Sequence, residues 1–121
     1  MDSMEKMLNQ LWGTQIQEFN LDLNNHKINM VINADDKRHI KLEIWDISSF
    51  YWVDDHFQID NDSWGFMQLE EFHILKGIKV QSTGGHFNES SAPNLLLEIW
   101  NSRLLIEAQK ITIDNQTFQL I

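Results

Sequence analysis

The residues with the most specific spacing for chemistry lie in an acidic segment, residues 60–65. Counted from Asp60, a second aspartate (Asp62), a glycine and Glu71 fall at the third, sixth and twelfth positions of an EF-hand calcium loop, in which carboxylate oxygens surround the cation. Trp64 stands at the fifth position, where an oxygen ligand is needed, and the flanking residues alternate like strands. Asp60, Asp62 and Glu71 are therefore a calcium candidate with an incomplete ligand set, and a turn between strands is the interpretation that we favour.

Other catalytic or metal-binding signatures are missing from the sequence. There is no cysteine, no glycine-flanked serine nucleophile and no glycine-rich phosphate loop, and the five histidines have no metal-ligand spacing. Residues 54–56, Asp-Asp-His, could pair a carboxylate with an imidazole, but neighbouring strand residues face opposite ways. A carboxylate-based hydrolase would need an acid and a base from glutamates whose separation the sequence leaves open: Glu43, Glu70, Glu71, Glu98 and Glu107. We expect no enzyme and no cofactor.

The net charge restricts the class of partner. Eighteen acidic residues against nine Lys and Arg give a formal charge of −9. Phosphate backbones and anionic lipids repel such a chain, so nucleic acid and membrane surfaces are not expected partners. A basic protein would be attracted, and its encounter rate raised.

Aromatic side chains flank the acidic stretch. Phe50, Tyr51 and Trp52 precede it and Trp64 lies within it. In a strand, Phe50 and Trp52 share one face and Tyr51 takes the other, so at least one ring is expected to be exposed. Rings beside carboxylates are typical anchors for a basic partner, although rings that fill the core are the alternative. The candidate partner-binding residues are Asp54, Asp55, Asp60, Asp62, Glu70 and Glu71, with Trp64 or Tyr51 as the anchor.

The elements that must position these residues are mostly strands. Apolar residues at helical spacing predict an amphipathic helix over about residues 2–12, ended by Gly13. The body, about 14–121, alternates with period two. It predicts a hairpin of 19–23 with 28–32, a strand at 40–44, a bend near Ser48-Ser49, strands at about 66–75 and 77–82, a loop over Ser82–Pro93, strands near 94–101, 103–110 and 111–113, and a last hairpin at Asp114-Asn115.

These elements predict one domain, residues 1–121, of the α+β class and mostly antiparallel β. Either a curved meander or a two-sheet sandwich, with one N-terminal amphipathic helix, is compatible. Leu42-Glu-Ile-Trp45 recurs as Leu97-Glu-Ile-Trp100, which a duplicated half-domain or coincidence would explain. Sheet edges need protection, and an edge-to-edge homodimer is one way to supply it. With no secretory signal or membrane span, we expect a cytoplasmic protein.

Two blocks of the chain, 42–55 and 97–108, resemble the YxiG-like family of small Bacillus-type proteins. The opening residues 8–12 and the closing residues 111–118 are similar to that family too. The resemblance carries no established activity, but in size and genomic company the family resembles immunity proteins that neutralise toxins. The expected function is therefore an acidic, immunity-type module that neutralises a basic toxin domain, a nuclease for example. A small-ligand or calcium-binding β-domain and a carboxylate-based hydrolase are the alternatives.

Overall fold

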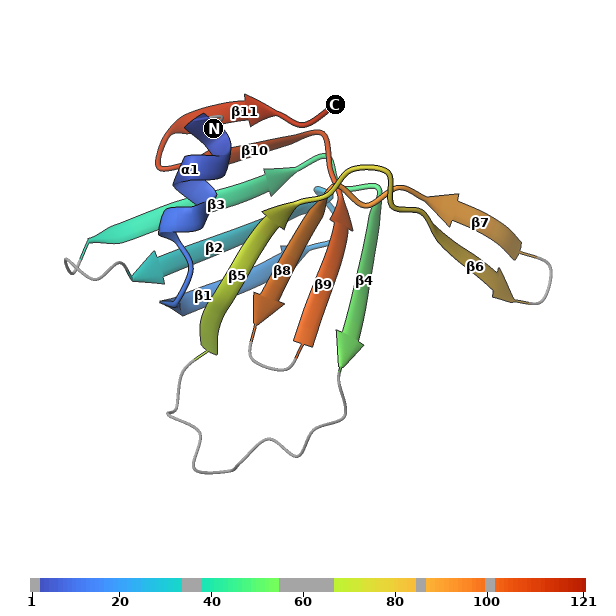
Figure 1. The fold of residues 1–121 in the computed structure, drawn as a ribbon, viewed down its shortest axis with the longest axis horizontal. Helices are drawn as coiled ribbons and strands as arrows, with labels where there is room; N and C mark the ends of the chain where they lie inside the picture. The colour runs from blue at the N-terminus through green and yellow to red at the C-terminus, as the bar shows by residue number, and fades with distance from the viewer. Residues whose placement is uncertain (1–2, 34–37, 55–66, 85–86, 100–101) are drawn as a thin grey trace.

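The structure is a computed structural model that describes residues 3–33, 38–54, 67–84, 87–99 and 102–121 (Figure 1). One helix and eleven strands lie in these ranges: α1 (Ser3–Gln10), β1 (Thr14–Asp22), β2 (Lys27–Asn33), β3 (His39–Trp45), β4 (Ser49–Asp54), β5 (Met67–Ile74), β6 (Val80–Gly84), β7 (Phe87–Ser91), β8 (Leu95–Ile99), β9 (Ser102–Glu107), β10 (Lys110–Ile113) and β11 (Gln116–Gln119). The prediction of a mostly antiparallel β protein with one short N-terminal helix is confirmed.

Nine of the strands form one continuous sheet in the order β11-β10-β3-β2-β1-β5-β8-β9-β4. All pairs are antiparallel, and β1 pairs with β5 only through Thr14–Ile16. This short junction divides the sheet into a β1 arm (β11, β10, β3, β2 and β1) and a β5 arm (β5, β8, β9 and β4). The strands of the β1 arm run across the view of Figure 1 and those of the β5 arm run down it. The sequence left two architectures open, a curved meander and a two-sheet sandwich. The nine strands form one curved sheet.

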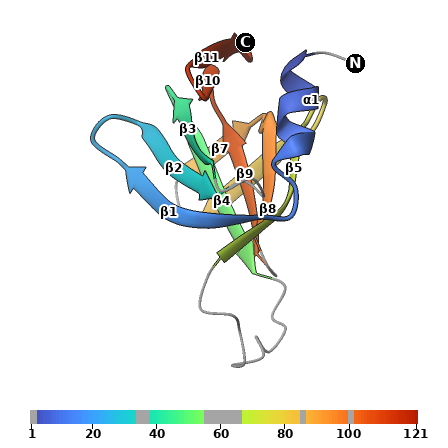
Figure 2. The ribbon, with the colours of Figure 1, turned by 90° about the vertical axis from the view of Figure 1, so that its left-hand side faces the viewer.

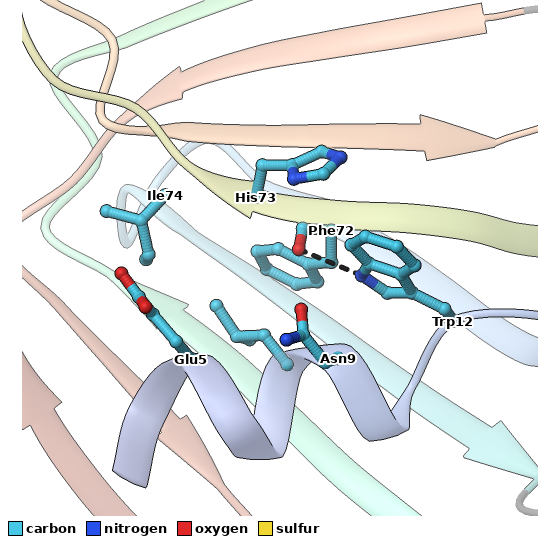
Figure 3. Close-up of a pocket in the computed structure, with 7 residues that line it drawn as sticks. Glu5, Asn9, Trp12, Phe72, His73 and Ile74 are labelled. Atoms are coloured by element: carbon cyan, nitrogen blue, oxygen red, sulfur yellow. Dashed lines mark hydrogen bonds between the residues drawn. The ribbon is translucent and has the colours of Figure 1, made fainter. Parts of the chain in front are cut away.

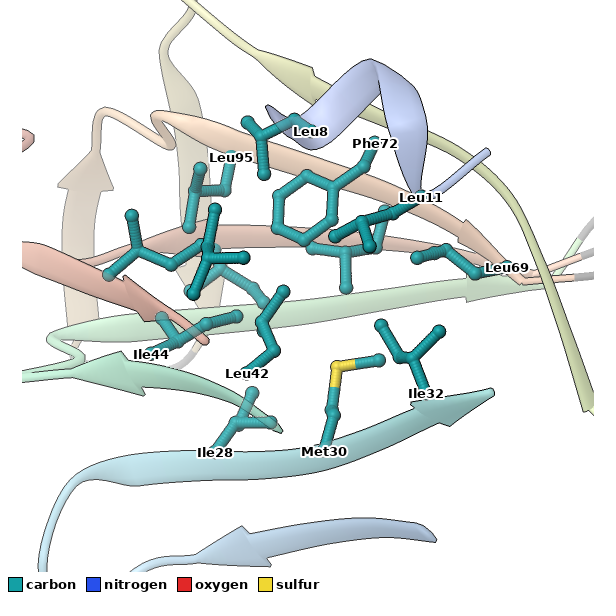
Figure 4. Close-up of a cluster of buried hydrophobic side chains, with 14 of the residues drawn as sticks. Leu8, Leu11, Ile28, Met30, Ile32, Leu42, Ile44, Leu69, Phe72 and Leu95 are labelled. Atoms are coloured by element: carbon teal, nitrogen blue, oxygen red, sulfur yellow. The ribbon is translucent and has the colours of Figure 1, made fainter. Parts of the chain in front are cut away.

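Alternating residues on both arms supply the core. Ile28, Met30 and Ile32 of β2 are fully buried, and so are Leu42 and Ile44 of the neighbouring β3. Their intervening residues are half-buried or exposed, which is the pattern expected of strands that bury one face. Side chains from β5, β8 and β9 complete the same cluster, with Phe72 and Leu95 close to the helix (Figure 4). The core therefore holds both arms and α1 together.

The helix α1 has only 8 residues, and an isolated helix of that length does not persist in water. Met4 and Leu8 of α1, followed by Leu11, are buried in the common core. Figures 1 and 2 both place α1 beside β5. Gly13 follows with a φ of +79°, and its N–H donates to the Leu69 carbonyl oxygen at 2.7 Å. A glycine is suited to this conformation because no Cβ opposes it. The sequence predicted that the helix would extend to about residue 12. It ends at Gln10 because the chain then turns toward β1.

Two expectations about the segment between β5 and β8 are wrong. The loop expected over Ser82–Pro93 contains β7, which pairs with β6 from Val80↔Ser91 to Gly84↔Phe87. The two strands form a ribbon apart from the main sheet (Figure 1). A strand was expected to begin at residue 77, but Gly77 has a φ of +74° and β6 begins three residues later. The β6–β7 ribbon was not predicted because a pair of strands outside the core needs no buried face and therefore no apolar alternation.

The Leu-Glu-Ile part of the repeated motif lies on two strands in comparable positions, and Trp100 lies outside the described residues. β3 is third from one end of the nine-stranded order and β8 is third from the other. In both copies the Leu and Ile are buried and the Glu between them is only half-buried. Both glutamates form ion pairs, Glu43 with Lys27 at 2.9 Å and Glu98 with Arg103 at 3.7 Å. The repeat therefore has a common structural role in the two arms.

Candidate protein-binding surface

Three glutamates gather on the side of the β5 arm that faces away from the core. In the pairing of β5 with β8, Leu69 lies opposite Ile99 and Glu71 opposite Glu98, so Glu70 is an extra residue in β5. Such a bulge leaves two residues of one strand against one of its partner. Glu71 and Glu98 are consequently direct neighbours of like charge, with Glu70 beside them. Like charges placed opposite each other destabilise a sheet.

The charges of these glutamates are only partly balanced. Glu98 lies 3.7 Å from Arg103, and a Glu71 oxygen lies 2.7 Å from Nε2 of His73. The pKa of Glu70 is raised by partial burial first, and then by the negative charges of Glu98 and Glu71. The group therefore keeps an excess of negative charge, which a cation from outside would relieve.

An apolar row runs across the four strands next to these charges. Strand pairing aligns Tyr51, Leu105, Leu96 and His73, all half-buried, across β4, β9, β8 and β5. The adjacent row on the same face aligns Val53, Arg103, Glu98 and Glu71 in the same way. We call these two rows, together with Glu70, the outer surface. It combines apolar area with acidic groups.

Of the predicted partner-binding residues, Glu70 and Glu71 are brought together on the outer surface, and Tyr51 lies at its far end. Asp54 ends β4, opposite Ser102. Asp55, Asp60, Asp62 and Trp64 lie outside the described residues.

The aromatic residues of β4 have different environments. The Tyr51 hydroxyl accepts a hydrogen bond from Ser91 Oγ at 3.0 Å, which ties this ring to the β6–β7 ribbon. Trp52, its neighbour, is 68% exposed, and β4 is the last strand of the sheet order. Trp52 is therefore the more exposed ring, although it lies opposite buried Leu104, on the other face of the sheet from Tyr51. The sequence predicted at least one exposed ring and named Tyr51 or Trp64 as the anchor. Arg103, Leu96 and Leu105 were not identified, and Glu98 was considered only for hydrolysis, because only strand pairing brings them beside β5 and β4.

The alternative chemistries gain little from the described residues. Glu71, the proposed twelfth ligand of the calcium loop, lies within β5 and is engaged by His73. Within the described ranges, no group of three or more His, Asp or Glu side chains is arranged to hold a metal ion. Among the glutamates considered for hydrolysis, Glu43 is 2.9 Å from Lys27 in the other arm, and Glu107 accepts from the Ala92 N–H at 3.2 Å. They do not form one catalytic group with Glu70 and Glu71.

A model of the YxiG-like protein family matches residues 4–118 of the chain. The match runs from α1 to β11 and includes both arms. No curated protein and no solved structure matches the chain. In the described part of the chain, no helix is long and apolar enough to cross a membrane.

Proposed function

The chain belongs to the YxiG-like family, and on that premise we propose that it is an acidic protein-binding module of the immunity type, which occludes a basic toxin domain. The observation that carries the proposal is the outer surface, where three glutamates border an apolar row. We place the protein in the cytoplasm, where such a module would meet an incoming toxin.

Association would proceed in two physical steps. The charge of −9 attracts a basic domain over a distance, and this raises the association rate. At contact, Glu70 and Glu71 pair with Lys or Arg side chains while Leu96 and Leu105 lose water against the partner. The predicted acidic residues Asp54, Asp55, Asp60 and Asp62 contribute to the net negative charge of the chain. A toxin whose cations must hold nucleic acid phosphates would be blocked in this way, because its binding groups are occupied.

The raised pKa of Glu70 makes the strength of the proposed complex depend on pH. The pKa of Glu70 is raised in the free protein by burial and by Glu98 and Glu71. A bound cation favours the ionised form, so complex formation at acidic pH releases a proton from this group. Binding through the outer surface is therefore expected to weaken as the pH falls toward the ordinary glutamate range.

The test is binding to the basic C-terminal domains of secreted proteins encoded beside this chain, measured by surface plasmon resonance over a range of salt concentrations. A triple variant, Glu70→Gln, Glu71→Gln and Glu98→Gln, is compared with a control, Glu18→Gln, Asp46→Asn and Asp114→Asn, that removes the same charge elsewhere. We expect the first to weaken binding at least about tenfold, equivalent to about 1.4 kcal/mol, and the second far less. A complex equally strong in both variants would overturn the assignment of the surface. A failure of every basic domain to bind would overturn the function.

A further inference from the structure

A cavity of about 310 Å³ lies between α1 and β5. Glu5, Leu8 and Trp12 line it from the helix and the turn that follows, and Phe72, His73 and Ile74 line it from β5 (Figure 3). The volume is at the lower end of the roughly 300–1,000 Å³ typical of small-ligand sites. It suits one side chain or a ligand of similar size. We call this space the α1–β5 cavity.

The cavity lies where one edge of β5, beyond Leu69, has no partner strand among the described residues. β1 pairs with Met67, Gln68 and Leu69 and then diverges from β5. Backbone groups alternate in direction along a strand, and the Leu75 N–H donates to Asn94 on the β8 side. Phe72 and Ile74 therefore direct their peptide groups toward α1. One of these peptide groups is hydrogen-bonded to Trp12, whose indole N–H donates to the Phe72 carbonyl oxygen at 3.0 Å.

The charged group of the cavity is the carboxylate of Glu5. It is half-buried, and Figure 3 shows it extending from α1 toward Ile74 of β5. Among the described residues, no hydrogen bond or ion pair engages it. None of the 7 lining residues is Lys or Arg, and His73 is held by Glu71 at 2.7 Å. The cavity therefore lacks a cation of its own and disfavours an anion.

The remaining walls suit an aliphatic chain that carries such a cation. Of the apolar lining residues, Leu8 and Phe72 are fully buried and Ile74 is half-buried. Trp12 is 39% exposed, with its ring held edge-on to His73 at 4.9 Å between centroids. Long basic side chains bury their methylene stems against apolar surface and keep the charged head at a polar group. An indole ring attracts a nearby cation as well.

We propose that the α1–β5 cavity receives one Lys or Arg side chain of the protein partner, with the charged head at Glu5 and the stem along Trp12 and Ile74. This proposal rests on the proposed function, since it names the group of the basic partner that anchors the complex. His73 connects the two regions, because it lines the cavity and ends the apolar row of the outer surface. A partner lying on the outer surface would thus have the cavity at its margin.

The chemistry of the cavity is tested without the partner, using n-butylguanidinium as the probe and the neutral n-butylurea as its isostere. The resonance of the Trp12 indole N–H is followed by ¹⁵N–¹H NMR and is assigned with Trp12→Phe. We expect a saturable shift with butylguanidinium at a dissociation constant of about 1–10 mM, weakened about tenfold in Glu5→Gln, and no such shift with butylurea. Glu18→Gln, an equal charge change on an exposed residue of β1, serves as the matched control.

Three outcomes overturn the cavity proposal: no saturable shift, an equal response to butylurea, or an equal affinity in Glu5→Gln. If Glu5→Gln fails to fold, Glu5→Asp, which withdraws the carboxylate by one methylene, is expected to weaken the probe in the same direction. The partner arm then compares Glu5→Gln with the outer-surface triple variant. Loss of toxin-domain binding in the triple variant alone would leave the proposed function standing and remove the cavity from it. Loss in both supports the cavity as the anchor.

Discussion

The indole N–H of Trp12 donates a hydrogen bond to the carbonyl oxygen of Phe72, with 3.0 Å between the two heavy atoms. Next to it, the Gly13 N–H donates to the Leu69 carbonyl oxygen at 2.7 Å. The Gly13 bond lies at the end of the β1–β5 pairing, and the Trp12 bond satisfies a backbone acceptor of β5 just beyond it. The Trp12 side chain and the turn at Gly13 therefore hydrogen-bond to β5 where its pairing with β1 ends.

Replacing Trp12 with Phe is expected to destabilise the protein by about 1 kcal/mol, because the Phe72 carbonyl loses its donor in a half-buried place. Urea unfolding at equilibrium measures the change. Trp52→Phe is the control, since Trp52 is 68% exposed at the edge of the sheet. An unchanged free energy of unfolding in Trp12→Phe would mean that water satisfies this carbonyl equally well.

Asn94 joins the start of β8 to the end of β9 through its amide. Its Nδ2 donates to the Ala108 carbonyl oxygen at 2.7 Å, and its Oδ1 accepts from the Ala108 N–H at 3.1 Å. Asn94→Ala is expected to cost about 2 kcal/mol, from two hydrogen bonds of about 1 kcal/mol each. Asn94→Asp should be destabilised too, because it sets a carboxylate against a carbonyl oxygen. Gln119→Ala, at an exposed position of β11, should unfold at the urea concentration of the parent protein.

Glu70→Gln is expected to raise stability at pH 7. The pKa of Glu70 is raised in the folded state, first by burial and then by Glu98 and Glu71, from an ordinary value of 4.5. The folded protein therefore binds more protons than the unfolded one above pH 4.5, and stability falls as the pH rises through the raised value. Thermal unfolding from pH 4 to 7 should show the variant's advantage growing with pH. An advantage that is constant over this range would contradict the argument.

The pKa of Asp22 is shifted in the opposite direction to that of Glu70. In the turn between β1 and β2 it accepts hydrogen bonds from the side chain and the backbone N–H of Asn25, at 2.8 and 3.2 Å, and these lower its pKa from 3.8. A lowered pKa stabilises the folded state above the ordinary value, and the contribution is lost as the pH falls through the lowered value. Asp22→Ala should therefore be less stable than the parent at pH 7 and approach it as the pH falls below the ordinary value of 3.8, in a thermal series extended to lower pH.

The repeated motif predicts equivalent costs at its two leucines. Leu42 and Leu97 are both fully buried, so replacing either with Ala should cost about 2–5 kcal/mol through lost burial and the cavity left behind. Leu23→Ala is the control, because Leu23 is 75% exposed and its loss should change stability by less than about 0.5 kcal/mol. A leucine of the motif that behaves like Leu23 would show that its arm contributes little to the common core.

Sequence periodicity and turn residues predicted the elements whose one face is buried and two hairpins, β1 with β2 and β10 with β11, but could not predict how strands distant in the sequence pair. The alternation at Ile28, Met30 and Ile32 and at Leu42 and Ile44 predicted the buried face correctly, since burial requires that pattern. The β6–β7 ribbon was missed because it lies outside the core and has no such pattern. The position of β4 beside β9 depends on contacts between residues about fifty positions apart, for which local propensity carries no signal.

The residues of the candidate site also fall into those visible in the local sequence and those brought in by strand pairing. Glu70 and Glu71 were identified because acidic residues beside aromatic ones are visible in the sequence. Glu98 joins them through the β5–β8 register and Arg103 through the β8–β9 register. Neither the bulge at Glu70 nor the unpaired edge of β5 can be read from composition, because both depend on where a neighbouring strand ends.

The strand order also has a consequence for how the chain is made. β1, β2 and β3 pair in sequence and can form hairpins as they leave the ribosome, whereas β4 pairs only with β9, which is synthesised about fifty residues later. Until residues 102–107 exist, Phe50 and Trp52 have no strand to join. Refolding dominated by such distant pairings is expected to take milliseconds to seconds, at roughly the slow end for a domain of this size. Among the described strands, β4 is therefore the one that waits longest for a partner during synthesis.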